Sequence, residues 1–108
     1  MRIDIGGGVR LFVDVQGPGL VPDGAQMREK PTLICMHGGP GFDHSAFKPG
    51  FDALADIAQI VYYDHRGHGR SDARPPEEWT LDTWADDIVR LSDALGIVKP
   101  IVLGQSFG

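Results

Sequence analysis

The chain has 108 residues, of which 42% are hydrophobic and 23% are charged, a composition ordinary for one small globular domain. Its formal net charge of −5 argues against nucleic acid or an anionic membrane as a partner, because either would require a basic face. The single cysteine, Cys35, excludes a disulfide within the chain, and no apolar run has the length of a signal peptide or a transmembrane helix. We therefore expect a cytoplasmic location and a buried, unreactive Cys35.

Two short strands are predicted at the start of the chain. Every second residue from Val9 to Val15 is a branched aliphatic residue, a pattern typical of a strand with one buried face. The segment Arg2 to Ile5 can pair antiparallel with it across the glycines at 6–8. Residues 16–30 contain Gly-Pro-Gly and Pro-Asp-Gly sequences, which predict a loop without an evident role.

Three continuous apolar segments follow, at 32–36, 57–63 and 101–103, as expected of strands covered on both faces. A modest helical pattern over 51–57 separates the first two. A stronger pattern lies between the second and the third, with Thr80 as a predicted N-cap and Gly96 as a predicted C-terminal stop. Its apolar residues recur at steps of three and four and form one stripe: Leu81, Trp84, Ile88, Leu91 and Leu95.

This alternation of buried strands with helices predicts right-handed crossovers and a parallel sheet. The fold class is therefore α/β, with an antiparallel first strand pair followed by parallel strands and crossover helices. In open α/β sheets the chemistry lies beyond the carboxyl ends of the strands. The loops that follow the three apolar strands are therefore the places to look for a site.

The third apolar strand runs into Gly104-Gln105-Ser106-Phe107-Gly108, a G-x-S-x-G pattern. Such a pattern forms a sharp strand-to-helix turn that holds the serine in a strained conformation with its Oγ exposed. The two glycines are needed because the strand and helix backbones crowd each other there. We take Ser106 as the candidate nucleophile; a plain Gly/Ser turn is the alternative.

The first apolar strand runs into His37-Gly38-Gly39-Pro40-Gly41. A glycine pair lets a backbone N–H approach a developing negative charge, and a proline stiffens the turn, which suits one half of an oxyanion hole. We expect Gly39 to be the donor of this loop and Phe107 to supply the second N–H. The other residues of the loop are expected to support it, with the His37 ring fixing the turn through a hydrogen bond to the loop backbone.

The middle strand runs into Asp64-His65-Arg66-Gly67-His68-Gly69-Arg70-Ser71-Asp72. We interpret it as a tight loop, tied by Asp64 and Arg66, that supports the oxyanion loop from below, with His68 and Ser71 as candidates for substrate contact. A metal site at His65 and His68 with a neighbouring aspartate is the alternative, but the spacing matches no zinc pattern and we expect no metal.

Phosphate-binding loops are excluded by the sequence itself. A G-x-G-x-x-G fingerprint would need glycine where the chain has His44 or Asp72, and no G-x-x-x-x-G-K-[ST] motif occurs. No nucleotide cofactor is therefore expected.

In this order and each after a strand, H-G-G-P-G, D-x-R-G-x-G-x-S and G-x-S-x-G resemble the motifs of the α/β-hydrolase superfamily, over the chain from about Pro31. The resemblance implies that residues 1–108 are the N-terminal part of a single core domain that ends at the nucleophile elbow. The H-G-G-P-G form is most similar to the proline iminopeptidases, which release an N-terminal proline from peptides. Those enzymes usually have glutamine at the position of His65 and tryptophan at that of Phe107.

The resemblance implies acyl transfer without a cofactor, in which Ser106 attacks a carbonyl and the N–H groups of Gly39 and Phe107 hold the oxyanion. In this superfamily the acid and the histidine base come after the serine, so both would follow residue 108. The expected partners are a small ester or amide, or a short peptide, and the remainder of the hydrolase chain; residues 1–108 alone are expected to be inactive. Carboxylesterase, lactonase or amidase activity, and a non-hydrolytic ligand-binding role, are the alternatives. Ser106 excludes the haloalkane dehalogenase and epoxide hydrolase branches, which attack with an aspartate.

Overall fold

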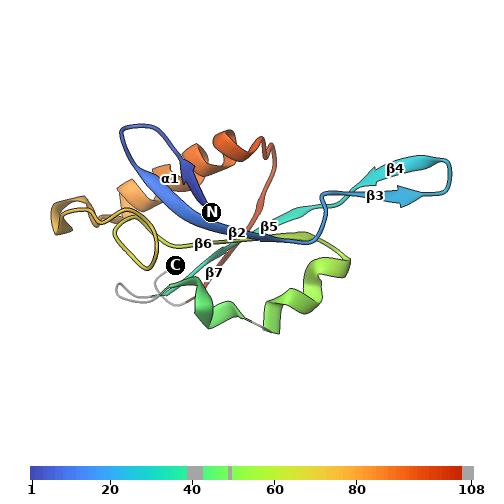
Figure 1. Ribbon diagram of the computed structural model, residues 1–108, viewed down its shortest axis with the longest axis horizontal. Coiled ribbons are helices and arrows are strands. Elements are labelled where there is room, and N and C mark those ends of the chain that lie inside the picture. The colour runs from blue at the N-terminus through green and yellow to red at the C-terminus, as the bar shows by residue number, and fades with distance from the viewer. Residues whose placement is uncertain (39–42, 49, 106–108) are drawn as a thin grey trace.

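The computed structural model describes residues 1–38, 43–48 and 50–105, and its main feature is a five-stranded sheet in the order β1-β2-β6-β5-β7 (Figure 1). Strand β2 is antiparallel to β1 and β6, whereas β5 is parallel to β6 and β7. The predicted antiparallel start followed by parallel strands is confirmed. The strands are β1 (Arg2–Asp4), β2 (Arg10–Gln16), β5 (Thr32–Met36), β6 (Gln59–Tyr63) and β7 (Ile101–Gly104).

The connections between the parallel strands cover opposite faces of the sheet. The short 3₁₀ helices η1 (His44–Phe47) and η2 (Gly50–Asp56) join β5 to β6 below the sheet in Figure 1, and α1 (Leu81–Leu95) lies above it on the way to β7. Because β6 and β7 flank β5 on its two sides, the direction of the connections reverses between β5 and β7. Such a reversal is the place where open α/β sheets bind ligands.

Helix α1 begins and ends where its capping residues predict. The Thr80 Oγ1 accepts a hydrogen bond from the Thr83 N–H at 3.1 Å, and Gly96 adopts φ +71° at the C-cap. The prediction that Leu81 belongs to the apolar stripe is wrong, because this residue of the first turn is 65% exposed. The stripe also omits Asp87, which is buried because its carboxylate pairs with Arg66.

The sheet has an apolar layer on each face. Because successive residues of a strand point to opposite faces, Ile34 packs in the layer beneath α1 while its neighbour Cys35 packs in the layer above η1 and η2. Burial raises the pKa of the Cys35 thiol to about 11. A thiol in that state is a poor nucleophile, in agreement with its expected role as a small apolar side chain.

Residues 16–30 are not the loop that the sequence predicts. They contain the antiparallel hairpin of β3 (Leu20–Asp23) and β4 (Gln26–Glu29), which projects away from the sheet in Figure 1. The turn Gly24-Ala25 joins the strands, with Gly24 at φ +63°, a conformation that tight hairpin turns require. The Asp-Gly sequence is a hairpin signal, but the flanking residues lack the alternation that would have identified strands.

Two other predicted strands differ in detail. The middle strand begins at Gln59, because Ile57 still belongs to the turn that closes η2. The third strand is predicted to be covered on both faces, but Ile101 and Val102 are 54% and 46% exposed. Among the described strands β7 pairs only with β5, so it lies at an edge of the sheet. Within the described ranges, no helix has the length and apolar content needed to cross a bilayer.

Candidate active site

The ends of β5 and β7 bring together the two segments with the strongest chemical signals. Met36 is paired with Gly104, and the Gln105 N–H donates to the Met36 carbonyl at 3.1 Å. The chain therefore leaves the sheet toward Gly39 and toward Ser106 from neighbouring positions. Five of the predicted site residues lie outside the described residues: Ser106, Phe107, Gly39, Pro40 and Gly41.

His37 is buried at the end of β5 and uses both of its ring nitrogens. Its Nδ1–H donates to the Gly38 carbonyl at 2.7 Å, and its Nε2 accepts from the His65 N–H at 2.9 Å. Burial lowers the pKa of His37, and a neutral ring is the form that can accept at Nε2. Both nitrogens are occupied by backbone groups, so this ring has none left to act as a base on a nucleophile.

His65 is buried beside His37, and the two rings meet edge to face with their centroids 4.2 Å apart. Its Nε2–H donates to the His37 carbonyl at 3.1 Å, and its Nδ1 accepts from the Tyr63 hydroxyl at 3.3 Å. Burial, together with the neighbouring His37, lowers the pKa of His65 to about 4, so the ring is neutral near pH 7. The sequence pattern points to His65 only as a metal ligand or as a departure from a family motif, and neither describes this supporting role.

Asp64 is fully buried and joins the loop after β6 to η1. Its Oδ1 accepts from the His44 backbone N–H at 2.8 Å and from the His44 Nδ1 at 2.7 Å, while its Oδ2 accepts from the Arg70 N–H at 2.9 Å. A Cβ on Gly69 would lie 2.3 Å from the Asp64 Oδ2, which explains the glycine there. His44 is not among the predicted site residues, because no local pattern links it to a partner 20 positions away.

Arg66 ties the same loop to the helical layer. Its guanidinium binds both carboxylate oxygens of Asp87 in α1, at 3.1 and 2.9 Å, and Glu78 at 2.7 Å. Burial by itself would lower the pKa of Arg66, but the two carboxylates outweigh it and raise the pKa. The guanidinium therefore stays charged and fixes the loop against α1, rather than contacting the described ends of the predicted oxyanion loop.

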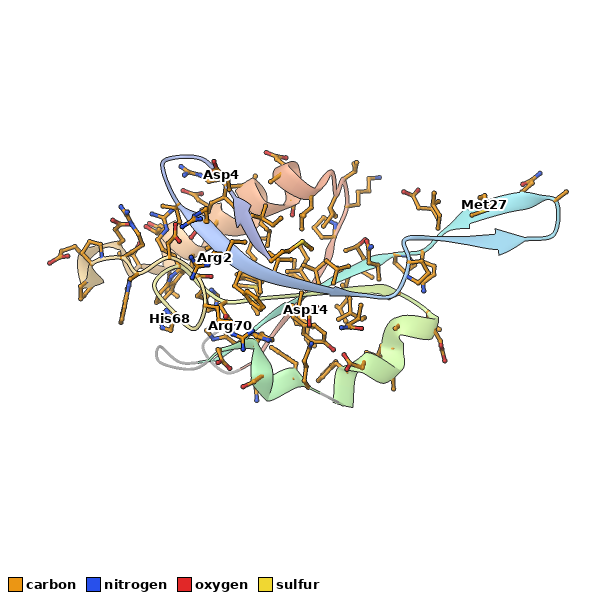
Figure 2. The ribbon with its side chains drawn as sticks, in the orientation of Figure 1. Arg2, Asp4, Asp14, Met27, His68 and Arg70 are labelled. Atoms are coloured by element: carbon orange, nitrogen blue, oxygen red, sulfur yellow. The ribbon has the colours of Figure 1, made fainter. Side chains whose placement is uncertain are left out.

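The two candidates for substrate contact have different surroundings. Ser71 bonds within the fold, since its Oγ donates to the Asp64 carbonyl at 2.6 Å and accepts from the Phe12 N–H at 2.8 Å. His68, labelled in Figure 2, is 4% exposed and donates from Nδ1 to the Arg66 carbonyl at 3.0 Å, but its Nε2 has no hydrogen-bond partner among the described residues.

No group of three or more histidine, cysteine, aspartate or glutamate side chains is arranged to hold a metal in the part of the chain that the structure describes.

A cavity of about 220 Å³ adjoins the carboxyl end of β7, and its lining is mostly apolar: Phe47, Phe51, Leu103, Gly104 and Gln105. A larger cavity, of about 790 Å³, lies at the amino ends of the parallel strands, where Thr32 and Gln59 line it. The smaller cavity is the candidate site, because the loops with the three motifs leave the carboxyl ends of the strands.

Comparison with known proteins gives consistent results. A family model described as alpha/beta hydrolase fold matches residues 31–108. The proline iminopeptidase of Lactobacillus crispatus is 39% identical over 84 residues, which are 74% of this chain and 28% of that protein.

Two solved structures extend the comparison. The proline iminopeptidase of Mycobacterium smegmatis is 32% identical with a TM-score of 0.81, covering 100% of this chain and 36% of that one. The enol-lactonase of Burkholderia xenovorans LB400 is 25% identical with a TM-score of 0.77, covering 96% of this chain and 36% of that one. The chain thus spans about a third of the length of the proteins it matches.

Proposed function

This chain belongs to the alpha/beta hydrolase family, and we propose that it forms the N-terminal part of a serine hydrolase in which Ser106 is the nucleophile. The observation that carries the proposal is the pairing of Met36 with Gly104. Because of this pairing, the His-Gly-Gly-Pro-Gly segment and the G-x-S-x-G segment begin at adjacent positions. These positions lie between β5 and β7, where the direction of the connections reverses. A nucleophile and an oxyanion loop must converge on one carbonyl, and this register supports that convergence.

In the proposed reaction the Ser106 Oγ attacks the substrate carbonyl and its proton passes to a histidine base supplied by the rest of the enzyme. The N–H groups of Gly39 and Phe107 stabilise the oxyanion, and each such donor typically contributes about 3 kcal/mol to the transition state. The leaving group departs with a proton from the base, and water then hydrolyses the acyl-enzyme. No metal or cofactor takes part in these steps.

The substrate class that we propose is a peptide with an N-terminal proline. The similarity to the proline iminopeptidases of Lactobacillus crispatus and Mycobacterium smegmatis supports it. The 220 Å³ apolar cavity beside β7 also supports it, because an apolar cavity of about 150 Å³ accommodates a benzene ring and a proline ring is smaller. The lactonase neighbour supports the second candidate, hydrolysis of a small ester or lactone.

The test uses the complete protein and its Ser106→Ala variant. The parent protein should react with a fluorophosphonate probe and hydrolyse proline p-nitroanilide or short p-nitrophenyl esters, and Ser106→Ala should lose labelling and nearly all turnover. Ser45→Ala is the matched control: it removes an exposed hydroxyl of η1 and should keep both properties. Turnover by Ser106→Ala within a factor of about ten of the parent would refute the nucleophile. A parent protein that neither labels nor turns over would instead indicate a ligand-binding role.

A further inference from the structure

The segment between β5 and η1 is held at both of its described ends by two consecutive residues, Asp64 and His65. His65 contacts His37 at one end, and Asp64 contacts His44 at the other. We propose that Asp64 and His65 form a clamp that positions the glycine segment for catalysis. This inference rests on the proposed function, because the segment carries Gly39, the proposed oxyanion donor.

At the first end, His65 makes two hydrogen bonds to one residue. Its backbone N–H donates to the His37 Nε2 at 2.9 Å, and its ring Nε2–H donates to the His37 carbonyl at 3.1 Å. Both rings are buried, so water does not compete for these bonds. The His37 Nδ1–H in turn donates to the Gly38 carbonyl at 2.7 Å, which extends the constraint to the residue before Gly39.

At the second end, the Asp64 Oδ1 also makes two hydrogen bonds to one residue. It accepts from the backbone N–H and the ring Nδ1 of His44, at 2.8 and 2.7 Å. The His44 ring lies with its centroid 5.2 Å from that of Phe12. The Arg70 N–H holds the other carboxylate oxygen at 2.9 Å, so the carboxylate itself is fixed in place.

The clamp stands on a rigid base. Asp64 and His65 directly follow the central strand β6, and the next residue, Arg66, is fixed to α1 through Asp87. Supporting hydrogen bonds from rigid elements are what hold a catalytic group in its productive geometry.

The catalytic rate depends strongly on the position of the oxyanion donor, which the clamp would fix. An oxyanion donor must lie about 2.7–3.1 Å from the developing charge, and a displacement of about 1 Å costs on the order of a hundredfold in rate. Loss of the clamp should therefore lower the turnover of bound substrate. It should leave ground-state binding nearly unchanged, because neither Asp64 nor His65 contacts substrate in this proposal. Both are positioning residues.

The experiment compares His65→Ala, His65→Gln and Asp64→Asn in the complete protein. His65→Ala removes the ring donor to the His37 carbonyl and should lower kcat by about 10- to 100-fold with KM changed less than about twofold. His65→Gln should restore most of kcat, because a side-chain amide N–H can donate to the same carbonyl. Asp64→Asn loses the charge that strengthens the bonds from His44, and should lower kcat in the same way.

The matched control is Asp72→Asn. Asp72 is a carboxylate of the same loop that also accepts from a backbone N–H, but its partner is Arg10 in β2, at 2.9 Å. Asp72→Asn should leave kcat and KM within about twofold of the parent values. A general loosening of the loop would instead affect Asp64→Asn and Asp72→Asn alike.

A second measurement separates positioning from folding. An alkylboronic acid forms a tetrahedral adduct with a nucleophilic serine and places an oxygen at the oxyanion position, so its affinity should fall in parallel with kcat across the clamp variants. Equal kcat and boronate affinity in His65→Ala and the parent would overturn the clamp. So would losses confined to thermal stability. Failure of the proposed function looks different: the parent itself would then bind no boronate, and either Ser106→Ala would keep the turnover of the parent or the parent would have none.

Discussion

His37 and His65 lie at the ends of β5 and β6 as buried, neutral rings whose nitrogens all have hydrogen-bond partners. A histidine can donate and accept at once only when it is neutral, so protonation of either ring would break a bond. His65 carries the larger consequence because its pKa is lowered to about 4. At the residue scale, the hydrogen bonds of these two rings are therefore sensitive to acid, independently of any catalytic base.

We predict that this sensitivity appears in stability. Below pH 6.5, the ordinary pKa of the ring, the unfolded chain binds a proton at His65, whereas the folded protein resists protonation until about pH 4. Stability is thus full above pH 6.5 and falls as the pH drops through this window, by about 3 kcal/mol in total and about 2 kcal/mol by pH 5.

Urea unfolding of the complete protein at pH 7 and pH 5 measures this fall, with His65→Gln as the reference that cannot titrate. The parent should lose about 2 kcal/mol more than the variant between the two pH values. The same loss in both proteins would show that His65 does not supply the pH dependence.

At the scale of elements, the connections rather than the strands determine how the site is supported. The loop after β6 contacts β2 through Ser71, η1 through Asp64 and α1 through Arg66. Its chain turns sharply enough to do so because Gly67 and Gly69 adopt φ of +80° and +51°. The turn of the β3–β4 hairpin also has a glycine with positive φ, Gly24, but no atom lies within 4 Å of the place where its Cβ would be.

This contrast yields a matched pair of variants. Gly24→Ala imposes only the strain of a left-handed residue, about 1 kcal/mol, because nothing lies within 4 Å of the added methyl group. Gly69→Ala adds a contact 2.3 Å from the Asp64 Oδ2 and 3.0 Å from the Asp43 Cβ, both in buried or partly buried surroundings.

Thermal unfolding of the complete protein should therefore show a clearly larger destabilisation for Gly69→Ala, by about 2 kcal/mol or more beyond that of Gly24→Ala. Its activity should fall as well, because the contact displaces the carboxylate that holds His44. Equal destabilisation of the two variants would mean that the loop after β6 relaxes freely around the methyl group.

At the scale of the whole molecule, β7 lies at one edge of the described sheet. Ile101 and Val102 keep about half of their surface exposed, and β7 has β5 as its one partner among the described strands. An apolar edge strand of this kind is competent to pair with another chain. The segment that carries the proposed nucleophile follows directly from that edge.

Residues 1–108 produced alone should therefore associate or remain poorly folded, and they should show no esterase activity. Circular dichroism melts, size-exclusion chromatography and p-nitrophenyl ester turnover measure these properties. A monomer with a cooperative melt and turnover would contradict the proposal that this chain is the N-terminal part of a larger catalytic domain.

The sequence alone determined the features that depend on neighbours along the chain. Strand β5 and helix α1 lie where apolar runs, periodicity and the caps Thr80 and Gly96 predict them, because backbone preferences and capping bonds act within a few residues. The order of the three loop motifs along the chain likewise indicates the family, and the family model confirms it. The β3–β4 hairpin escaped prediction, since a lone two-stranded ribbon has no buried face to impose alternation on its sequence.

Only the tertiary structure decided which residues meet. The pairing of Asp64 with His44 and the burial of Asp87 against Arg66 join segments that lie about 20 residues apart in the chain, which local patterns do not encode. A buried charge is tolerated only beside a partner, and the partner comes from a distant part of the chain once the sheet has formed. The sequence predicted Asp64 as a support of the oxyanion loop, but its partner His44 and the supporting role of His65 were for this reason visible only in the fold.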